Sequence, residues 1–467
     1  MNRMKIILKY LLLMILPASC WTGCAKLLDV PVPDGKTTGR EVFNNKDSAT
    51  AAVLGIYAAI SSTNNPLSGA ASVFNSVYVD DLIYTGSQRQ INDFYVSNIA
   101  TDNTLLQTIF WAPVYKYIYS TNACIKGLAE SDELTSELKN QLTGECKFLR
   151  ALLYFNLIRC FGDVPLVQST LYMENEQMPR TSVGQVENFI IEDLKAAKSL
   201  LSSAYPSADR VRANRWCAGA LLAEFYLYRK EWALADKEAS EVINAGYYHL
   251  EDIEKVFLSG SKEAIFQLQP VLIGHNTMEA NWLVPSGTGR PVFALTTSLS
   301  AAFESGDKRK KGWIGSKTVS SGIYEYVFKY RQRLDFSSNF KLTEFSAVLR
   351  LAAIYLARAE ARTALGQLPD AINDLDMVRQ RAGLPLIAVE YPSIPANELA
   401  EKIQHERRVE LFAEFGYRLY DLKRTDRINE VMKTTKPDHW VETDTLWPIP
   451  ASEIMLNPLL LQNKGYK

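Results

Sequence analysis

The chain has 467 residues, of which 47% are hydrophobic and 22% charged, and 51 basic side chains nearly balance 52 acidic ones, so the net charge is −1. This composition is typical of a globular protein, and it lacks the basic excess with which proteins bind nucleic acids or anionic lipids. The length suffices for one large domain or a few smaller ones, and the 23 Tyr and 8 Trp residues favour recognition through flat, amphipathic faces.

The first residues form the pattern of an export signal. Two basic residues precede the apolar run Ile6–Leu16, which is well short of the roughly 20 residues that a bilayer-spanning helix needs. Small residues then lead to Cys20 and Cys24, and the glycine before Cys24 favours that residue as the lipidation site, with Cys20 as the alternative. We expect residues 1–23 to be a lipoprotein signal peptide; the other interpretation is a secreted protein with an incidental cysteine. Residues 25–33, punctuated by prolines, would then tether the folded body to the lipid.

The remaining cysteines are Cys124, Cys146, Cys160 and Cys217, and none of them forms a C-x-x-C pair of the kind found in zinc clusters. Cys146 and Cys160 fall on one predicted helix, roughly 21 Å apart at 1.5 Å per residue, so they cannot bridge each other. We expect buried free thiols, although other pairings stay open.

Three segments in the first half have helical periodicity, namely 47–61, 106–128 and 131–161. The second half of the last segment is apolar on nearly every side, which predicts deep burial. Gly162 should end that helix, and Pro165 should prevent it from resuming.

Two later segments, 221–246 and 357–383, repeat each other. A shift of 136 residues aligns their characteristic positions: Ala223 with Ala359, Glu224 with Glu360, Trp232 with Leu368, Ala235 with Ala371, and Val242 with Val378. Each reads as helix, tight turn and helix, with small residues at the contact, which is typical of a tetratricopeptide unit. Such hairpins need neighbours to bury their faces, and segment 106–161 is expected to supply a third unit.

Two stretches have a different, irregular texture, about 62–103 and about 247–345. The second is rich in glycine and proline turns and contains β-type runs at 264–268 and 323–330. Irregular segments on a helical scaffold commonly carry function, so we place the binding residues there.

Several motifs resemble those of the SusD/RagB family of outer-membrane lipoproteins. They are the helix GECKFLRALLYFNLIRCFGDVPLV (144–167), the segment HERRVELFAEFGYRLYDLKR (405–424), the ending WPIPASEIMLNPLLLQNKGY (447–466) and the opening CAKLLDVPVP (24–33). Their order and spacing match across essentially all of the mature chain. The resemblance implies one domain over residues 24–467, mostly α, with a tetratricopeptide-type scaffold and a loop-rich insertion containing short strands.

The resemblance also implies a function. Members are non-enzymatic and are lipid-anchored on the outer face of the outer membrane. Each sits as a lid on a SusC-like TonB-dependent transporter and delivers oligosaccharides to it, or peptides in some members. Capture of peptides therefore stays open as the alternative to capture of glycans. From the residues themselves we expect no cofactor and no metal.

Sugars present C–H faces to aromatic rings and hydroxyls to polar side chains, so the candidate ligand residues are aromatic and polar residues of the irregular segments. The aromatic candidates are Tyr84, Phe94, Tyr95, Trp282, Trp313, Tyr324 and Tyr326. The polar candidates are Asp81, Arg89, Asn92, Asn281 and Arg290. For each aromatic residue, packing beneath a loop is the structural alternative. By contrast, Trp111, Tyr154, Phe155, Trp216, Phe225 and Trp232 lie on helical stripes and are expected in the core.

Other patterns have simpler explanations than catalysis. Asp80, Asp81 and Asp93 could form a Ca²⁺ site. A glycoside hydrolase, by contrast, needs two carboxyls that face each other across a cleft, about 5–10 Å apart. Adjacent residues such as Asp80 and Asp81 normally point in different directions. The four histidines are scattered without metal spacing. The charged segment 405–424 is expected to be one long helix whose charges form ion pairs around an apolar stripe. A purely structural adaptor would lack an exposed aromatic platform.

Overall fold

The computed structural model describes residues 39–62, 64–337 and 339–466. The expected signal peptide, the lipidation site Cys24 and the tether lie outside the described residues. Of the helices that the structure describes, none is both long and apolar enough to cross a membrane.

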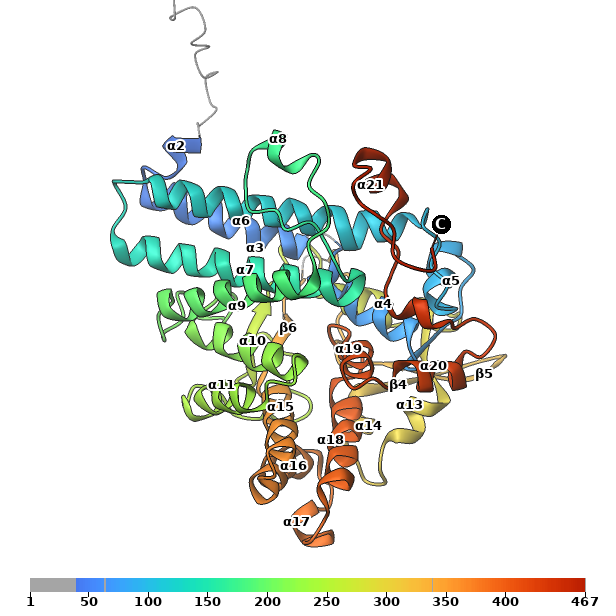
Figure 1. Ribbon diagram of the computed structural model, residues 1–467. Coiled ribbons are helices and arrows are strands. Elements are labelled where there is room, and N and C mark those ends of the chain that lie inside the picture. The colour runs from blue at the N-terminus through green and yellow to red at the C-terminus, as the bar shows by residue number, and fades with distance from the viewer. Residues whose placement is uncertain (1–38, 63, 338, 467) are drawn as a thin grey trace, which may run out of the picture.

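Paired helices form the scaffold, and each packs on the next in a continuous stack (Figure 1). They are α3 (Lys46–Ser62), α6 (Ala112–Glu130), α7 (Ser136–Phe161), α9 (Val183–Leu200), α10 (Arg215–Tyr228), α11 (Trp232–Asn244), α15 (Leu351–Ala364) and α16 (Leu368–Ala382). The mostly helical, tetratricopeptide-type architecture expected from the sequence is confirmed.

Shorter elements complete the chain between and after these pairs. The helical ones are α2 (Gly39–Val42), η3 (Pro66–Ala70), α4 (Ala71–Tyr78), α5 (Arg89–Tyr95), η4 (Leu106–Trp111), α8 (Tyr172–Asn175), α12 (Met278–Leu283), α13 (Thr297–Ala302), α14 (Lys308–Trp313), α17 (Ile387–Glu390), α18 (Ala396–Leu411), α19 (Tyr417–Arg424), α20 (Ile428–Thr435), η5 (Glu442–Thr445) and α21 (Ala451–Leu456).

Helix α7 is the centre of the scaffold. It begins later than expected because the Thr135 side chain caps it, accepting from the backbone N–H of Leu138 at 3.4 Å, and it ends at Gly162, which has φ 73°. Nearly every residue from Leu142 to Phe161 is buried, as its apolar sequence predicts. Gly144 permits a close approach, since a Cβ there would lie 2.7 Å from the side chain of Leu201.

The two repeats match in detail. The starts and ends of α10 and α15 differ by the predicted 136 residues, and so do the starts of α11 and α16. The turns also match, since Lys230 and Gly366 both have positive φ, 59° and 75°. The equivalent glutamates Glu224 and Glu360 each lie 3.9 Å from Arg407, so the two repeats converge on one guanidinium.

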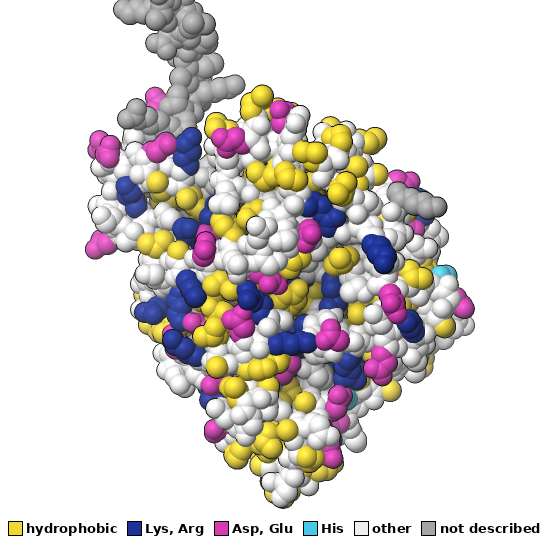
Figure 2. Space-filling view, viewed as in Figure 1, with side chains coloured by type: hydrophobic (Ala, Val, Ile, Leu, Met, Phe, Trp, Pro, Cys, Tyr) yellow, Lys and Arg dark blue, Asp and Glu magenta, His cyan; other side chains and the backbone are white. Residues whose placement is uncertain are grey.

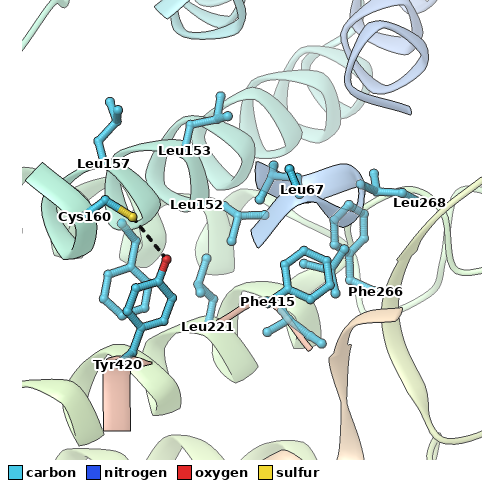
Figure 3. Packing of buried hydrophobic residues seen from close by; sticks show 14 of the residues in the cluster. Leu67, Leu152, Leu153, Leu157, Cys160, Leu221, Phe266, Leu268, Phe415 and Tyr420 are labelled. Atoms are coloured by element: carbon cyan, nitrogen blue, oxygen red, sulfur yellow. Dashed lines mark hydrogen bonds between the residues drawn. The ribbon is translucent and has the colours of Figure 1, made fainter. Parts of the chain in front are cut away.

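Three antiparallel strand pairs lie in the irregular segments or directly beside them. They are β1 (Leu82–Tyr84) with β3 (Phe293–Leu295), β2 (Ala264–Leu268) with β6 (Ser346–Arg350), and the hairpin β4 (Ile314–Val319) with β5 (Gly322–Val327). The strand predicted at 264–268 is confirmed. Figure 3 shows where the insertion meets the scaffold: Phe266 and Leu268 of β2 lie near Leu152 of α7 and Leu221 of α10, in one continuous core.

The expectation of one helix over 405–424 is wrong. The chain breaks between α18 and α19, where Ala413, Phe415 and Gly416 all have positive φ. A Cβ on Gly416 would lie 2.0 Å from Nδ2 of Asn75, so only glycine fits the approach of α4. The break turns Phe412 and Phe415 into the core.

The charges of this segment are structural, but most of their partners come from distant elements. Glu410 is fully buried and contacts Arg309, Arg350 and Arg381, which belong to α14, β6 and α16. Burial alone would raise the pKa of Glu410, but these three guanidinium groups hold it well below its usual range. The cluster thus ties the insertion to the repeats.

The cysteines agree with the sequence analysis. Cys124, Cys146, Cys160 and Cys217 are all buried and free. Cys160 Sγ lies 3.4 Å from the hydroxyl of Tyr420, and burial raises the pKa of its thiol.

Candidate functional site

A surface groove of about 370 Å³ lies between α5, β1, the start of α13 and the turn after α20; we call it the α5–α20 groove. These elements gather at one side of the molecule (Figure 1). The lining side chains that matter for chemistry are Asp80, Ile83, Tyr95, Thr296, Ser298, Thr435, Lys436, Pro437, Asp438 and His439.

Asp80 forms the charged floor of the groove. Arg418 donates to both carboxylate oxygens, Nε to Oδ1 at 2.9 Å and Nη2 to Oδ2 at 2.8 Å, and Arg408 lies 3.0 Å from Oδ2. Burial would raise the pKa of Asp80, but the hydrogen bonds and charge of Arg418, with Arg408, lower it overall. Thr296 Oγ1 donates to the Asp80 carbonyl at 2.7 Å and joins the α13 rim to this floor.

Lys436 and Tyr95 form one wall. The Lys436 ammonium donates to the carbonyls of Val77 and Tyr78 and to Ser97 Oγ, at 2.8–3.0 Å, and lies 5.5 Å from the centre of the Tyr95 ring. Burial lowers the pKa of Lys436 to about 7. The amine is committed to holding the chain together, which leaves the partly exposed Tyr95 ring as the aromatic surface of the wall.

The groove combines one aromatic ring and small apolar surfaces with hydroxyls, an imidazole and the exposed carboxylate of Asp438. Such a mixture suits a ligand with both C–H faces and many hydroxyls. Its lining carboxylates are Asp80, bound by two arginines, and Asp438, so the groove does not present two free carboxyls of the kind glycoside hydrolysis requires.

A second exposed surface lies on the hairpin of β4 and β5, which packs beside β3. Ser321 Oγ lies 3.2 Å from the hydroxyl of Tyr324, and the hydrogen bonds of Ser321 and then Arg290 lower the pKa of that phenol. The structure therefore brings the candidates Tyr324 and Arg290 together. Tyr326 covers Gly315 of the facing strand, where a Cβ would lie 2.2 Å from its ring.

Four candidates are buried, and for the three aromatic residues among them the structure has the alternative arrangement, packing beneath a loop. Trp313 is 1% exposed, packs on Phe257 and donates from Nε1 to the Ile253 carbonyl at 2.8 Å. Phe94 is fully buried. Tyr84 is 8% exposed because its ring packs on Phe293 and its hydroxyl accepts the N–H of Gln88.

Asp81 is the fourth, and it is fully buried with Oδ1 3.2 Å from Arg408 Nε. Burial raises its pKa, and Arg408 opposes this effect. The Ca²⁺ site weighed for Asp80, Asp81 and Asp93 does not form either. Arginines bind the first two, and Asp93 accepts from Asn103 Nδ2 at 2.9 Å.

The other candidates have mixed positions. Trp282 is half-buried against Phe74 and Phe293, with a buried Nε1 that has no hydrogen-bond partner. Asn281 accepts two hydrogen bonds from a neighbouring segment. Arg333 Nη2 donates to its backbone carbonyl at 3.4 Å, and the N–H of Leu334 donates to its side-chain Oδ1 at 3.0 Å. Asn92 is exposed on α5, and Arg89 forms an exposed ion pair with Asp102.

Sequence reasoning missed most of the α5–α20 groove. Thr296 and Ser298 lie inside the irregular segment but were not singled out, and the turn Thr435–His439 lies outside both irregular segments. Its composition, TKPDH before a buried tryptophan, is the signal that could have drawn attention to it.

Comparison with known proteins then identifies the family. Residues 308–466 match the family model described as SusD family, and residues 33–227 match the one described as starch-binding associating with outer membrane. The chain belongs to the SusD/RagB family. Among curated relatives, SusD-like protein P2 of Formosa agariphila is 26% identical over 98% of this chain and 100% of its own length. SusD-like protein P25 of the same organism is 24% identical over 76% of this chain and 79% of its own length.

Solved SusD-type structures share the fold. A SusD superfamily protein from Parabacteroides distasonis is 25% identical with a TM-score of 0.79, covering 92% of this chain and 100% of that one. A laminarin-binding SusD-like protein is 24% identical with a TM-score of 0.75, covering 90% and 100%. Surface glycan-binding protein A from Bacteroides fluxus is 21% identical with a TM-score of 0.76 and the same coverage.

Proposed function

We propose that this SusD/RagB protein captures oligosaccharides at the surface of the outer membrane and delivers them, unmodified, to a SusC-like TonB-dependent transporter. Lipid attached to Cys24 would anchor it. The single observation that carries the proposal is the α5–α20 groove, where the partly exposed ring of Tyr95 lies beside hydroxyl, imidazole and carboxylate side chains. The starch-binding description of the matching family and the glycan-binding names of two structural neighbours support it.

The groove also fits capture without bond cleavage. Its deepest carboxylate, Asp80, is neutralised by Arg408 and Arg418, so it serves as a rigid floor rather than a proton donor. A shallow site with one stacking residue binds each sugar weakly, and weak binding suits a protein that must release its ligand to a transporter.

Capture of peptides is the second candidate. The residues that line the groove include no tryptophan, which is the one observation that favours peptides over glycans. The carboxylate of Asp438 and the hydroxyls of the lining would then accept hydrogen bonds from backbone N–H groups of an extended peptide.

Calorimetry of the unlipidated mature protein against a panel of polysaccharides, oligosaccharides and peptides tests the proposal. We expect one glycan to bind and Tyr95→Ala to weaken that binding by about 5- to 30-fold, equivalent to about 1–2 kcal/mol. Tyr391→Ala is the matched control, because the Tyr391 side chain is accessible to solvent and, like Tyr95, has a lysine near its ring, with Lys402 4.8 Å from the ring centre, but it lies beside α17. Binding of peptides alone, or equal loss in both variants, would refute glycan capture in this groove.

A further inference from the structure

A second groove, of about 340 Å³, lies between α6, the loop that carries α8, and α21; we call it the α6–α21 groove. Its apolar lining comes from distant parts of the chain, including Trp111, Tyr115, Pro165, Met178, Leu456 and Leu460. Asn175 also lines it, and its side-chain oxygen is buried without a hydrogen-bond partner. Because a buried acceptor without a donor is costly, a bound group that donates a hydrogen bond to Asn175 would be favoured here.

The rim of the groove is unusually apolar. On α8, Tyr172 and Met173 are 73% and 78% exposed, and on α21, Met455 and Leu456 are 78% and 77% exposed. Figure 2 shows hydrophobic side chains gathered along this edge of the molecule. Exposed apolar side chains gathered in this way are typical of an interaction site.

The described chain starts on this same edge. In Figure 1, α2 lies at one end of α6, α21 lies near the other end, and α8 lies between them. Phe43, directly after α2, packs on Gly127 near the end of α6, where a Cβ would lie 2.1 Å from its ring. From Gly127 back to Tyr115 is 12 residues of α6, or ~18 Å at 1.5 Å per residue.

The residues that precede Gly39 have the composition and the reach to fill the groove. Residues 27–33 read LLDVPVP, and the alternation of valine and proline favours the extended polyproline conformation, which aromatic-lined grooves bind. Val32 is seven residues before Gly39, and seven extended residues span about 23 Å, enough to run the length of α6 to Tyr115. Asp29 of the segment, and Asp34 directly after it, would pass the exposed Lys116 and Lys126 of α6.

We propose that residues 27–33 of this chain bind in the α6–α21 groove, with a backbone N–H of the segment donating to Asn175 Oδ1. The valines and prolines would cover Tyr115, Pro165 and Leu456. If the lipid is on Cys24, only residues 24–26 then remain between the anchor and the folded body. Binding in the groove would thereby keep one fixed face of the folded domain next to the membrane. Without it, the domain would be connected to the lipid by a longer tether.

A photo-cross-linking experiment on the full-length exported protein tests this directly. A photoreactive benzoylphenylalanine at position 32 should cross-link within the same chain to peptides containing residues 111–119 or 453–461, as mapped by mass spectrometry. The same probe in place of Ile323, which is 71% exposed on the distant β4–β5 hairpin, should give no cross-link to these peptides. Cross-links from position 32 only to a second copy, to another protein or to other surfaces would overturn the proposal.

Two substitutions give an independent check. Leu456→Arg places a charge in the groove and should abolish the cross-link from position 32, whereas Ile323→Arg, at similar exposure, should leave its yield unchanged. In hydrogen exchange, Val30→Ser combined with Val32→Ser should remove amide protection from residues 111–119 and 453–461 without changing the melting temperature. Unchanged yield in Leu456→Arg, or unchanged protection in the tail variant, would show that the groove has another occupant. Neither readout involves the ligand, so the outcome is independent of the glycan-binding test.

Discussion

Arg418 of α19 clamps Asp80 with two short parallel hydrogen bonds, at 2.9 Å and 2.8 Å, across 338 residues of sequence. Asp80 is 4% exposed and lines the α5–α20 groove, so a charge pair of the C-terminal scaffold fixes the floor of the candidate binding site. Arg408 of α18 extends the clamp to Asp81 and to Ser298 on the groove rim. Arg408 lies before the break between α18 and α19, and Arg418 lies after it. The conformation of the groove therefore depends on this break, which sets the relative positions of the two arginines.

Removing one member of this pair should be costly. Arg418→Ala leaves the buried Asp80 carboxylate with Arg408 alone, and we expect a loss of about 3 kcal/mol in the free energy of unfolding, measured by urea titration at pH 7. Arg89→Ala is the control, since the Arg89–Asp102 pair is more than half exposed and should contribute about 0–1 kcal/mol. Equal effects of the two substitutions would mean that the clamp does not stabilise the fold.

Glu279 predicts a distinct pH dependence. Its side chain is 1% exposed, Oε2 accepts from Ser346 Oγ at 2.8 Å, Oε1 has no partner, and burial raises its pKa to about 7. The folded state holds this proton more tightly than the unfolded chain does. The stabilisation that the protonated Glu279 carboxyl gives to the fold is therefore complete below about pH 4.5 and is lost as the pH rises through 7. The free energy of unfolding of Glu279→Gln, compared with that of the parent, should therefore rise by about 2–3 kcal/mol between pH 5 and pH 8.5. Unfolding curves of both proteins at the two pH values provide the measurement, and parallel pH profiles would contradict the assignment.

The sequence predicts the scaffold well because its signals are local. The apolar periodicity of segment 131–161 and the 136-residue repeat both reflect contacts between neighbouring helices. The break after Leu411 escaped prediction, since the apolar stripe of segment 405–424 continues through it and the close approach of Asn75 to Gly416 is a long-range contact.

The candidate site was harder to predict because exposure depends on what packs across each side chain. Trp313 and Tyr95 both lie in irregular, aromatic-rich stretches. Lys329 and Phe257 cover Trp313, whereas Tyr95 faces the groove. The groove joins residues 80–96, 296–298 and 435–439, and no local pattern links segments so far apart. The abundance of tyrosine and tryptophan favoured recognition in general, and the family resemblance, carried by motifs that fold the scaffold, indicated the kind of ligand.

Trp313→Ala should act on stability rather than on a binding surface. The indole is buried, hydrogen-bonded to Ile253, and has the Lys329 ammonium 4.7 Å from its ring centre, so truncation leaves a cavity beneath a buried charge. We expect the free energy of unfolding to fall by about 3–5 kcal/mol, with a smaller loss for Trp313→Phe. Calorimetric melting measures this loss, and a variant that melts like the parent but fails to bind glycan would instead return Trp313 to the binding site.

Tyr324→Ala tests whether the β4–β5 hairpin extends the binding surface. Tyr324 is partly exposed, its hydroxyl is held by Ser321 and Arg290, and its strand packs beside β3, whose partner β1 borders the α5–α20 groove. If a long glycan lies across both surfaces, the substitution should weaken binding of long oligosaccharides by about 5-fold, or roughly 1 kcal/mol, and leave the affinity for the shortest ligand unchanged. Affinities for an oligosaccharide series of increasing length, measured with Tyr324→Ala and with Ile323→Ala as the neighbouring exposed control, separate the two cases. Equal loss at every length would place Tyr324 within the primary site, and no loss at any length would confine binding to the groove around Tyr95.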